Sequence, residues 1–190
     1  MTTNRDTRAA LMDFCRTRSP VTGFRRLQLC GHGRCDRHSK SVDPPSFSDQ
    51  GQSLGSLDRA ISDNLQHRLA EIEAAHATAG ARLKALIALY RAALDGGHTV
   101  CLCVAFSTCR DSLSEVVIAR VSAVRAMVLQ WITATFELGQ RDGSISAILD
   151  PADEAPATLA MLEGAHLAAR TEEDLATFDA ATRLLNARCQ

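Results

Sequence analysis

Mostly apolar side chains recur every three or four positions between residues 113 and 138, which is the spacing of one face of an α-helix. The main stripe consists of Leu113, Val117, Val121, Val124, Val128, Trp131, Thr135 and Leu138. A second set widens it and consists of Val116, Ile118, Met127, Ile132 and Phe136. A helix that is apolar over this much of its circumference is expected in the middle of its domain. We therefore expect the domain to be organised around residues 101–140.

Helical patterns also precede this central helix. Stripes of Leu and Ile predict helices over about 57–76 and 83–94, separated by a break at Gly80, and the second helix is followed by an Asp-Gly-Gly stop signal at 95–97. A short apolar helix is expected over about 99–109.

The boundaries of the later helices are marked by capping signals. Ser112 and Glu115 have the spacing of a capping box, which would open the central helix, and that helix is expected to end near Gly139. Asp150 before a proline predicts the start of a helix that runs to about residue 170. Thr171 is the expected cap of a last helix.

These patterns predict an all-α helical bundle with about six helices in 57–188, no strand and no internal repeat. The first part of the chain differs. A short helix is expected over about 5–14, but residues 16–56 contain eight Gly and Pro residues and keep no period. We therefore expect two regions: residues 1–56, mostly irregular, and a helical domain over 57–190. An irregular stretch this long inside a compact protein is unusual.

Composition narrows the function classes. The net charge is −1, and residues 1–60 carry ten Lys and Arg against six Asp and Glu, whereas 61–190 carry eleven against sixteen. No run of about 18 apolar residues predicts a membrane span, and the N-terminus lacks the apolar stretch of a signal peptide. Seven cysteines without a framework spacing favour reduced thiols, so we expect a cytoplasmic protein.

The ordered motifs of the helical region resemble the C-terminal half of the TetR/AcrR family of bacterial transcriptional regulators. The resemblance covers about 57–188, and its motifs are Leu89-Tyr90-Arg91, Leu94-Asp95-Gly96-Gly97, Cys101-Leu102-Cys103-Val104-Ala105, Phe136-Glu137-Leu138-Gly139-Gln140 with Asp142-Gly143, and the run from Leu162 to Arg170. It implies a homodimeric, ligand-responsive regulator, usually a repressor. Such a protein binds a small-molecule effector with its C-terminal half and operator DNA with an N-terminal helix-turn-helix. It implies no enzyme activity, cofactor, metal or membrane.

The resemblance also directs attention to candidate site residues. The effector pocket of this family lies between the helices, so polar and aromatic side chains there are candidates, although each is also a plausible core residue: Tyr90, His98, Cys103, Phe106, Met127, Trp131 and His166. The family dimerises through its last two helices, whose candidate contact residues here are Thr158, Leu162, Ala165, Ala169, Phe178, Ala181 and Leu185.

The helix-turn-helix that the family carries is not readable in residues 5–55. Reading the coding sequence one base later restores it. Codons that encode residues 30–50 can, in this shifted frame, encode the peptide ADMADAIGIRKASIHHHFPTK, and codons that encode residues 23–29 can encode GFDAFSY. Both strings resemble the DNA-reading unit of the same family. We therefore hypothesise a frameshift near residues 14–16 and a compensating one between about 54 and 60. The nucleotide sequence tests this, since a stop codon or an unrelated peptide in the shifted frame refutes it.

An alternative interpretation uses the same stretch for metal binding. Cys30, His32, Cys35 and His38 are four potential zinc ligands within nine residues, which suggests a helical zinc-binding protein or enzyme. The frame hypothesis explains these residues without a metal. No nucleophile with a base, metalloprotease motif or phosphate-binding loop is present, so the sequence gives no support for catalysis.

Overall fold

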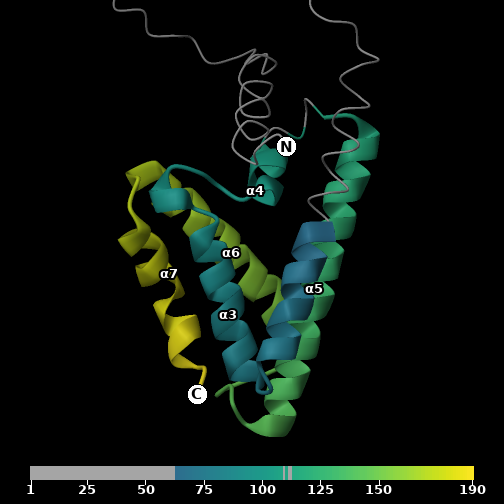
Figure 1. Cartoon of the computed structure of the whole chain (residues 1–190), viewed down its shortest axis with the longest axis vertical. Coiled ribbons are helices and arrows are strands. Elements are labelled where there is room, and N and C mark those ends of the chain that lie inside the picture. Colours follow the sequence, from purple (N-terminus) through teal and green to yellow (C-terminus); the bar gives the residue numbers. More distant parts are fainter. Residues whose placement is uncertain (1–62, 109, 111–112) are drawn as a thin grey trace, which may run out of the picture.

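The computed structural model describes residues 63–108, 110 and 113–190, drawn in colour in Figure 1. The expected short N-terminal helix, the irregular region, the Cys/His stretch and the frameshift hypothesis all fall on residues 1–62. These predictions therefore lie outside the described residues, and so does Ser112.

The described part of the chain is all-α, as expected, and its strand-like pairing is limited to an isolated bridge between Ile145 and Cys189. A helix covers residues 63–75. The elements that follow it are α3 (Ala79–Ala92), the 3₁₀ turn η1 (Asp95–Gly97), α4 (Leu102–Thr108), α5 (Glu115–Asp142), α6 (Pro151–Glu172) and α7 (Leu175–Ala187).

The helices form a bundle in which α3 lies between α7 and the long helix α5, and α6 packs on α5 and α7 (Figure 1). Helix 63–75 lies along α5 and turns sharply into α3. The short helix α4 lies at the end of the bundle opposite to this turn, beside the beginning of α5. We call residues 76–80, 142–150 and 188–190 the closed end, and residues 94–108 the α4 end.

The core confirms the central place of α5. Its residues Val128, Ile132 and Phe136 are at most 2% exposed, and they belong to the same buried cluster as Leu86 of α3 and Leu162 of α6. The expected wide apolar stripe is not buried throughout, because Val116 at the start of α5 is 62% exposed.

By length and composition, α5 could cross a membrane, and it is the only helix in the described ranges that meets this criterion. Its Val124, Val128, Ile132 and Phe136 form a buried stripe in the core of the bundle. A core helix meets the same criterion, so this finding is weak evidence for a membrane span.

Several helix boundaries differ from the expected ones. The N-cap of α5 is Ser114, whose side chain accepts a hydrogen bond from the Val117 N–H, and its C-cap is Gly143 rather than Gly139. Asp150 caps α6 as predicted. The cap of α7 is Asp174, whereas Thr171 lies inside α6.

Gly80 does not break a helix. It lies in the first turn of α3, after the N-cap Thr78, and it is buried. A Cβ atom at this position would lie 2.5 Å from the carbonyl oxygen of Ser144 and 2.9 Å from that of Gln190. Glycine is therefore required here by close approach to two distant backbone segments.

The closed end is joined by hydrogen bonds between these segments. The Gly80 N–H donates to Ser144 Oγ at 2.7 Å, and the Ala79 N–H donates to Asp142 Oδ2 at 2.8 Å. The Gln190 N–H donates to the Ser144 carbonyl oxygen at 2.8 Å. Ser144 thus ties the beginning of α3 to the end of the chain.

Candidate functional site

A histidine in the middle of α6 is the centre of a polar cluster inside the bundle. His166 is completely buried. Its Nδ1 accepts a hydrogen bond from the Cys101 N–H at 3.2 Å, and its Nε2 lies 2.9 Å from the Tyr90 carbonyl oxygen. Because Nδ1 accepts, Nε2 carries the proton and donates, which is the neutral form of the ring. His166 therefore contacts two backbone segments at once.

Aromatic rings hold the imidazole on both sides. The Tyr90 ring lies edge-to-face with it at a centroid distance of 5.5 Å, and the Phe178 ring does so at 5.6 Å. Such perpendicular contacts are favourable between aromatic rings. The orientation of His166 is thus fixed by α3 and α7 as well as by its hydrogen bonds.

Charged and thiol groups surround the Tyr90 side chain. Arg125 of α5 forms an ion pair with Glu163 of α6, and this pair lies close enough to interact electrostatically with the Tyr90 hydroxyl. Burial raises the pKa of the Tyr90 hydroxyl above its ordinary range, and Cys101, Cys103 and Glu163 act in the same direction. We call Tyr90, Cys103, Arg125, Glu163 and His166 the interior cluster.

The structure thus brings Tyr90, Cys103 and His166 together, out of the seven residues expected to bind an effector. His98 lies elsewhere: its side chain is 66% exposed, and its Nδ1 is 3.9 Å from Glu173 Oε2. Phe106 is buried in a small separate group with Val117.

Met127 and Trp131 are partly buried against the main core. The indole Nε1–H of Trp131 is buried and has no hydrogen-bond acceptor among the described residues. A buried donor without a partner is costly, so it marks a place where a bound group with an acceptor would be stabilised.

Sequence reasoning missed Arg125 and Glu163. Each lies on a helix that carries other charges, and a charged residue on a helix usually faces solvent. The signal was the position of Arg125 within the apolar run 113–138.

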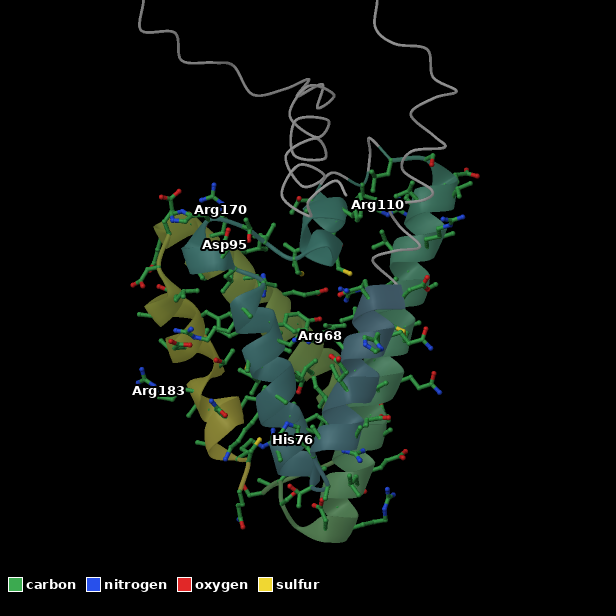
Figure 2. All side chains as sticks on the ribbon, viewed as in Figure 1. Arg68, His76, Asp95, Arg110, Arg170 and Arg183 are labelled. Atoms are coloured by element: carbon green, nitrogen blue, oxygen red, sulfur yellow. The ribbon has the colours of Figure 1, made fainter. Side chains whose placement is uncertain are left out.

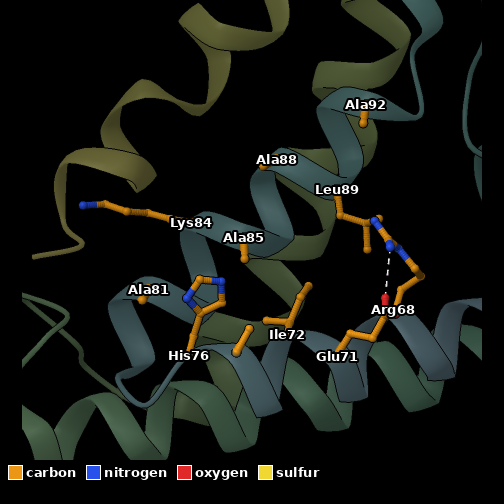
Figure 3. Close-up of a pocket in the computed structure, with 11 residues that line it drawn as sticks. Arg68, Glu71, Ile72, His76, Ala81, Lys84, Ala85, Ala88, Leu89 and Ala92 are labelled. Atoms are coloured by element: carbon orange, nitrogen blue, oxygen red, sulfur yellow. Dashed lines mark hydrogen bonds and ion pairs between the residues drawn. The ribbon is translucent and has the colours of Figure 1, made fainter.

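A second concave feature lies on the outer face of the bundle, between helix 63–75 and α3 (Figure 3). It is an open groove of about 640 Å³ whose floor is largely alanine and whose rim carries Arg68, Glu71, His76 and Lys84. Arg68 Nη1 pairs with Glu71 Oε2 at 2.9 Å. Figure 3 shows Lys84 extending away from this pair. None of the seven expected effector residues lines the groove.

The residues expected at the dimer contact lie mainly in the core of the single chain. Six of them are at most 3% exposed, and only Ala181 is on the surface: the six are Thr158, Leu162, Ala165, Ala169, Phe178 and Leu185. A partner that packs on α6 and α7 would instead meet their outward faces. These faces carry Leu167, which is 45% exposed, and Leu184, which is 79% exposed.

No group of three or more Cys, His, Asp or Glu side chains within 63–108, 110 and 113–190 has the arrangement of a metal site. The zinc interpretation rests on Cys30, His32, Cys35 and His38, which lie outside these ranges.

A model of a known protein family, described as "Tetracyclin repressor-like, C-terminal domain", matches residues 79–185. The chain belongs to this family. The matched range begins at α3 and ends within α7, so it contains the whole interior cluster. The TetR-like chain is a ligand-responsive transcriptional regulator, as the sequence motifs predicted.

Solved structures of TetR-family proteins share the fold. A TetR-family transcriptional regulator from Agrobacterium tumefaciens has a TM-score of 0.67 at 25% identity, over 76% of this chain and 86% of that one. A TetR regulator from Chloroflexus aurantiacus J-10-FL has a TM-score of 0.63 at 21% identity, over 74% and 72%.

The reduced form of NemR from E. coli has a TM-score of 0.61 at 19% identity, over 72% of each chain. A comparison with curated protein sequences finds no match. The relatives from Agrobacterium tumefaciens and Chloroflexus aurantiacus are regulators of transcription, and regulators of this kind are generally not enzymes.

Proposed function

We propose that the helical part of this chain is the effector-binding and dimerising half of a TetR-like cytoplasmic regulator, and that the effector binds at the interior cluster. The observation that carries the proposal is a set of polar side chains that converge on the buried Tyr90 in the domain that matches the family. Tyr90 is 8% exposed, whereas Glu163 and Arg125 are 17% and 36% exposed at the edge of the cluster. Small-molecule sites are mostly apolar and contain a few convergent polar groups. Tyr90, Cys103, Arg125 and Glu163 provide hydroxyl, thiol, cationic and anionic groups in that setting.

We expect Trp131 to take part through its unpaired indole N–H. His166 is fully engaged by its two backbone partners, so we assign it no direct contact with the effector. The His98 side chain is 66% exposed and lies 3.9 Å from Glu173, and we exclude it from the effector site.

A ligand screen tests the position of the site. The chain is screened by thermal shift against a library of small organic molecules, and the Kd of each hit is measured by calorimetry for Tyr90→Phe, Arg125→Gln and Trp131→Phe. Loss of one hydrogen bond to a bound ligand is expected to weaken binding by about tenfold. Ala88→Trp, which fills the outer groove, is the matched control and should leave Kd unchanged. If Ala88→Trp weakens ligand binding and the other three substitutions do not, the effector binds in the outer groove and not at the interior cluster.

We also propose that two copies associate through the outward faces of α6 and α7. Small residues on a helix face allow close approach of a partner helix. Ala157, Ala160 and Gly164 lie on the exposed face of α6, and a Cβ at Gly164 would meet no atom within 4 Å. Leu184 and Arg183 lie on the exposed face of α7, and Figure 2 shows Arg183 pointing away from the bundle.

Sedimentation velocity tests this surface. Leu184→Glu places a charge on the proposed contact and should convert a dimer to a monomer at micromolar concentration. Leu149→Glu is a matched control, because Leu149 is 87% exposed but belongs to the loop between α5 and α6 and not to either of the two helices proposed to form the contact. Dimers that survive Leu184→Glu and Gly164→Trp together would refute the proposed interface.

Finally, we propose that specific operator binding is impaired in this chain, because the DNA-reading segment is out of frame in residues 15–56. A gel-shift experiment compares the chain with a version whose shifted-frame peptide replaces this segment, using the DNA upstream of its own gene. Binding by the frame-restored version alone is the expected result. Tight, specific binding by the unaltered chain would refute the frameshift proposal and leave the effector site untouched.

A further inference from the structure

We propose that His166 is a positioning residue that couples the end of α3 to the beginning of α4. The two ring nitrogens contact backbone groups of two different segments: the Tyr90 carbonyl near the end of α3, and the Cys101 N–H directly before α4. The side chain itself belongs to a third element, α6. One buried ring therefore sets the distance between three parts of the bundle.

The ring has little freedom to change its partners. It is 0% exposed and lies between the Tyr90 and Phe178 rings, whose planes are at 87° and 83° to it. Rotation by half a turn about χ2 would exchange ring carbon and nitrogen positions and break both hydrogen bonds. A move of Tyr90 must then move the imidazole, and a move of the imidazole acts on Cys101.

The hydrogen bond between Cys101 and His166 is important for α4 because of how the rest of this helix packs. The helix has seven residues, and Val104 and Phe106 are the buried ones among the side chains that the structure describes there. Phe106 packs with Val117, Leu113 and Val121 at the start of α5, apart from the main core. The hydrogen bond at Cys101 therefore connects the beginning of α4 to the main core, which its own buried phenylalanine does not join.

Through this coupling, a structural change at the interior cluster would alter the α4 end of the bundle. In Figure 1 the α4 end and the first residues of helix 63–75 both lie toward the upper part of the bundle, away from the closed end. A ligand that shifts Tyr90 would change the position of α4 through His166. This last step rests on the proposed effector site, whereas the positioning role of His166 does not.

Two near-isosteric variants separate the two hydrogen bonds. In His166→Asn, the amide oxygen can occupy the place of Nδ1 and accept from the Cys101 N–H. In His166→Gln, the longer amide can donate to the Tyr90 carbonyl in place of Nε2, while the acceptor for Cys101 is lost. Both variants remove the aromatic ring, so the comparison between them cancels the loss of packing.

Amide hydrogen exchange, followed by mass spectrometry on peptides that cover 98–108, measures how readily the backbone of α4 and of the segment before it opens. We expect exchange in this range to be at least tenfold faster in His166→Gln than in His166→Asn. Peptides from α7 should exchange at similar rates in the two variants. Equal rates over 98–108, or faster exchange in the Asn variant, would overturn the proposal.

A measurement on the unaltered chain keeps the test valid if neither variant folds. Nitrogen NMR of the His166 ring at neutral pH should show a neutral ring with the proton on Nε2 and an unprotonated Nδ1. A proton on Nδ1 would be incompatible with the Cys101 hydrogen bond and would overturn the proposal. Because no effector is present, failure here is independent of the effector site and of operator binding.

Discussion

Distant segments meet at the closed end through short hydrogen bonds, and the α4 end is built differently. At the closed end, Gly80 approaches Ser144 and Gln190 so closely that no side chain fits between them. At the α4 end, the described contacts of a seven-residue helix include a small apolar group around Phe106, the buried Val104 and the hydrogen bond from Cys101 to the imidazole of His166. Local stability follows the density of such contacts, so the two ends are expected to open with different free energies.

This contrast suits a regulator that must transmit a signal. The closed end can act as a fixed reference for α3, α5 and the C-terminus. We expect the α4 end to change position at a smaller cost in free energy than the closed end. A ligand shifts such an equilibrium only by its difference in affinity for the two positions, so a weakly held element responds to a modest difference.

The largest expected effect is at the closed end. Gly80→Val would place side-chain atoms against the Ser144 and Gln190 carbonyls, and we expect a loss of about 3 kcal/mol or more in the free energy of unfolding, measured with urea. Ala126→Val is the control, because Ala126 is exposed on α5 and valine in place of alanine costs a helix less than about 1 kcal/mol. If Gly80→Val is tolerated, the closed end is not rigid.

The next effect concerns an ion pair at the same end. Arg188 donates to both carboxylate oxygens of Glu154, at 2.9 and 2.7 Å, and we expect Glu154→Gln to cost about 1–2 kcal/mol at pH 7. The hydrogen bond from Arg188 lowers the pKa of Glu154, and burial opposes this shift only in part.

The pH dependence of this pair follows from the direction of the shift. A carboxyl whose pKa is lowered by folding contributes stability above its ordinary pKa and loses it as the pH falls through the lowered value. The difference between the wild-type chain and Glu154→Gln should therefore shrink on acidification from pH 7. A difference in unfolding free energy that stays constant down to pH 3 would contradict the assignment.

A smaller global effect is expected at the α4 end. Phe106→Ala removes the main side chain of a separate apolar group, so α4 should open locally while the main core stays folded. We expect exchange of the α4 amides to rise at least tenfold, and the urea unfolding free energy to fall by less than about 1 kcal/mol. A loss of 3 kcal/mol, as is typical for a core phenylalanine, would show that the two ends unfold together.

The smallest effect is expected between the two ends, on the surface. Arg91 and Asp179 join α3 to α7 through hydrogen bonds of 2.6 and 2.8 Å, but their side chains are 44% and 48% exposed. Exposed pairs contribute about 0–1 kcal/mol, so Asp179→Asn should change the melting temperature by no more than a few degrees. Raising the salt concentration to 1 M should remove the difference.

The sequence predicted the helices because their periods and caps are local. Asp150 before Pro151 marked the start of α6 correctly. Gly80 was misread as a break because its function depends on Ser144, which is 64 residues away, and on the end of the chain. Local pattern does not contain such contacts.

The candidate site shows the same limit. Polar residues among apolar ones indicated Tyr90 and His166, but the pattern did not show that both nitrogens of His166 are used by backbone groups. Small residues on α6 suggested a contact face, but Thr158 and Ala165 face inward, and the open side is at Gly164. The direction of each side chain depends on how the helices pack.

Hydrogen exchange of the unaltered chain at residue resolution is the most direct test of the contrast between the two ends. We predict that the amides of Gly80, Ser146 and Gln190 exchange only through global unfolding, with the free energy measured by urea. The amides of 101–108 should exchange through local opening, with a clearly lower free energy and little dependence on urea. Equal free energies at both ends would contradict the account, because the α4 end would then be as fixed as the closed end.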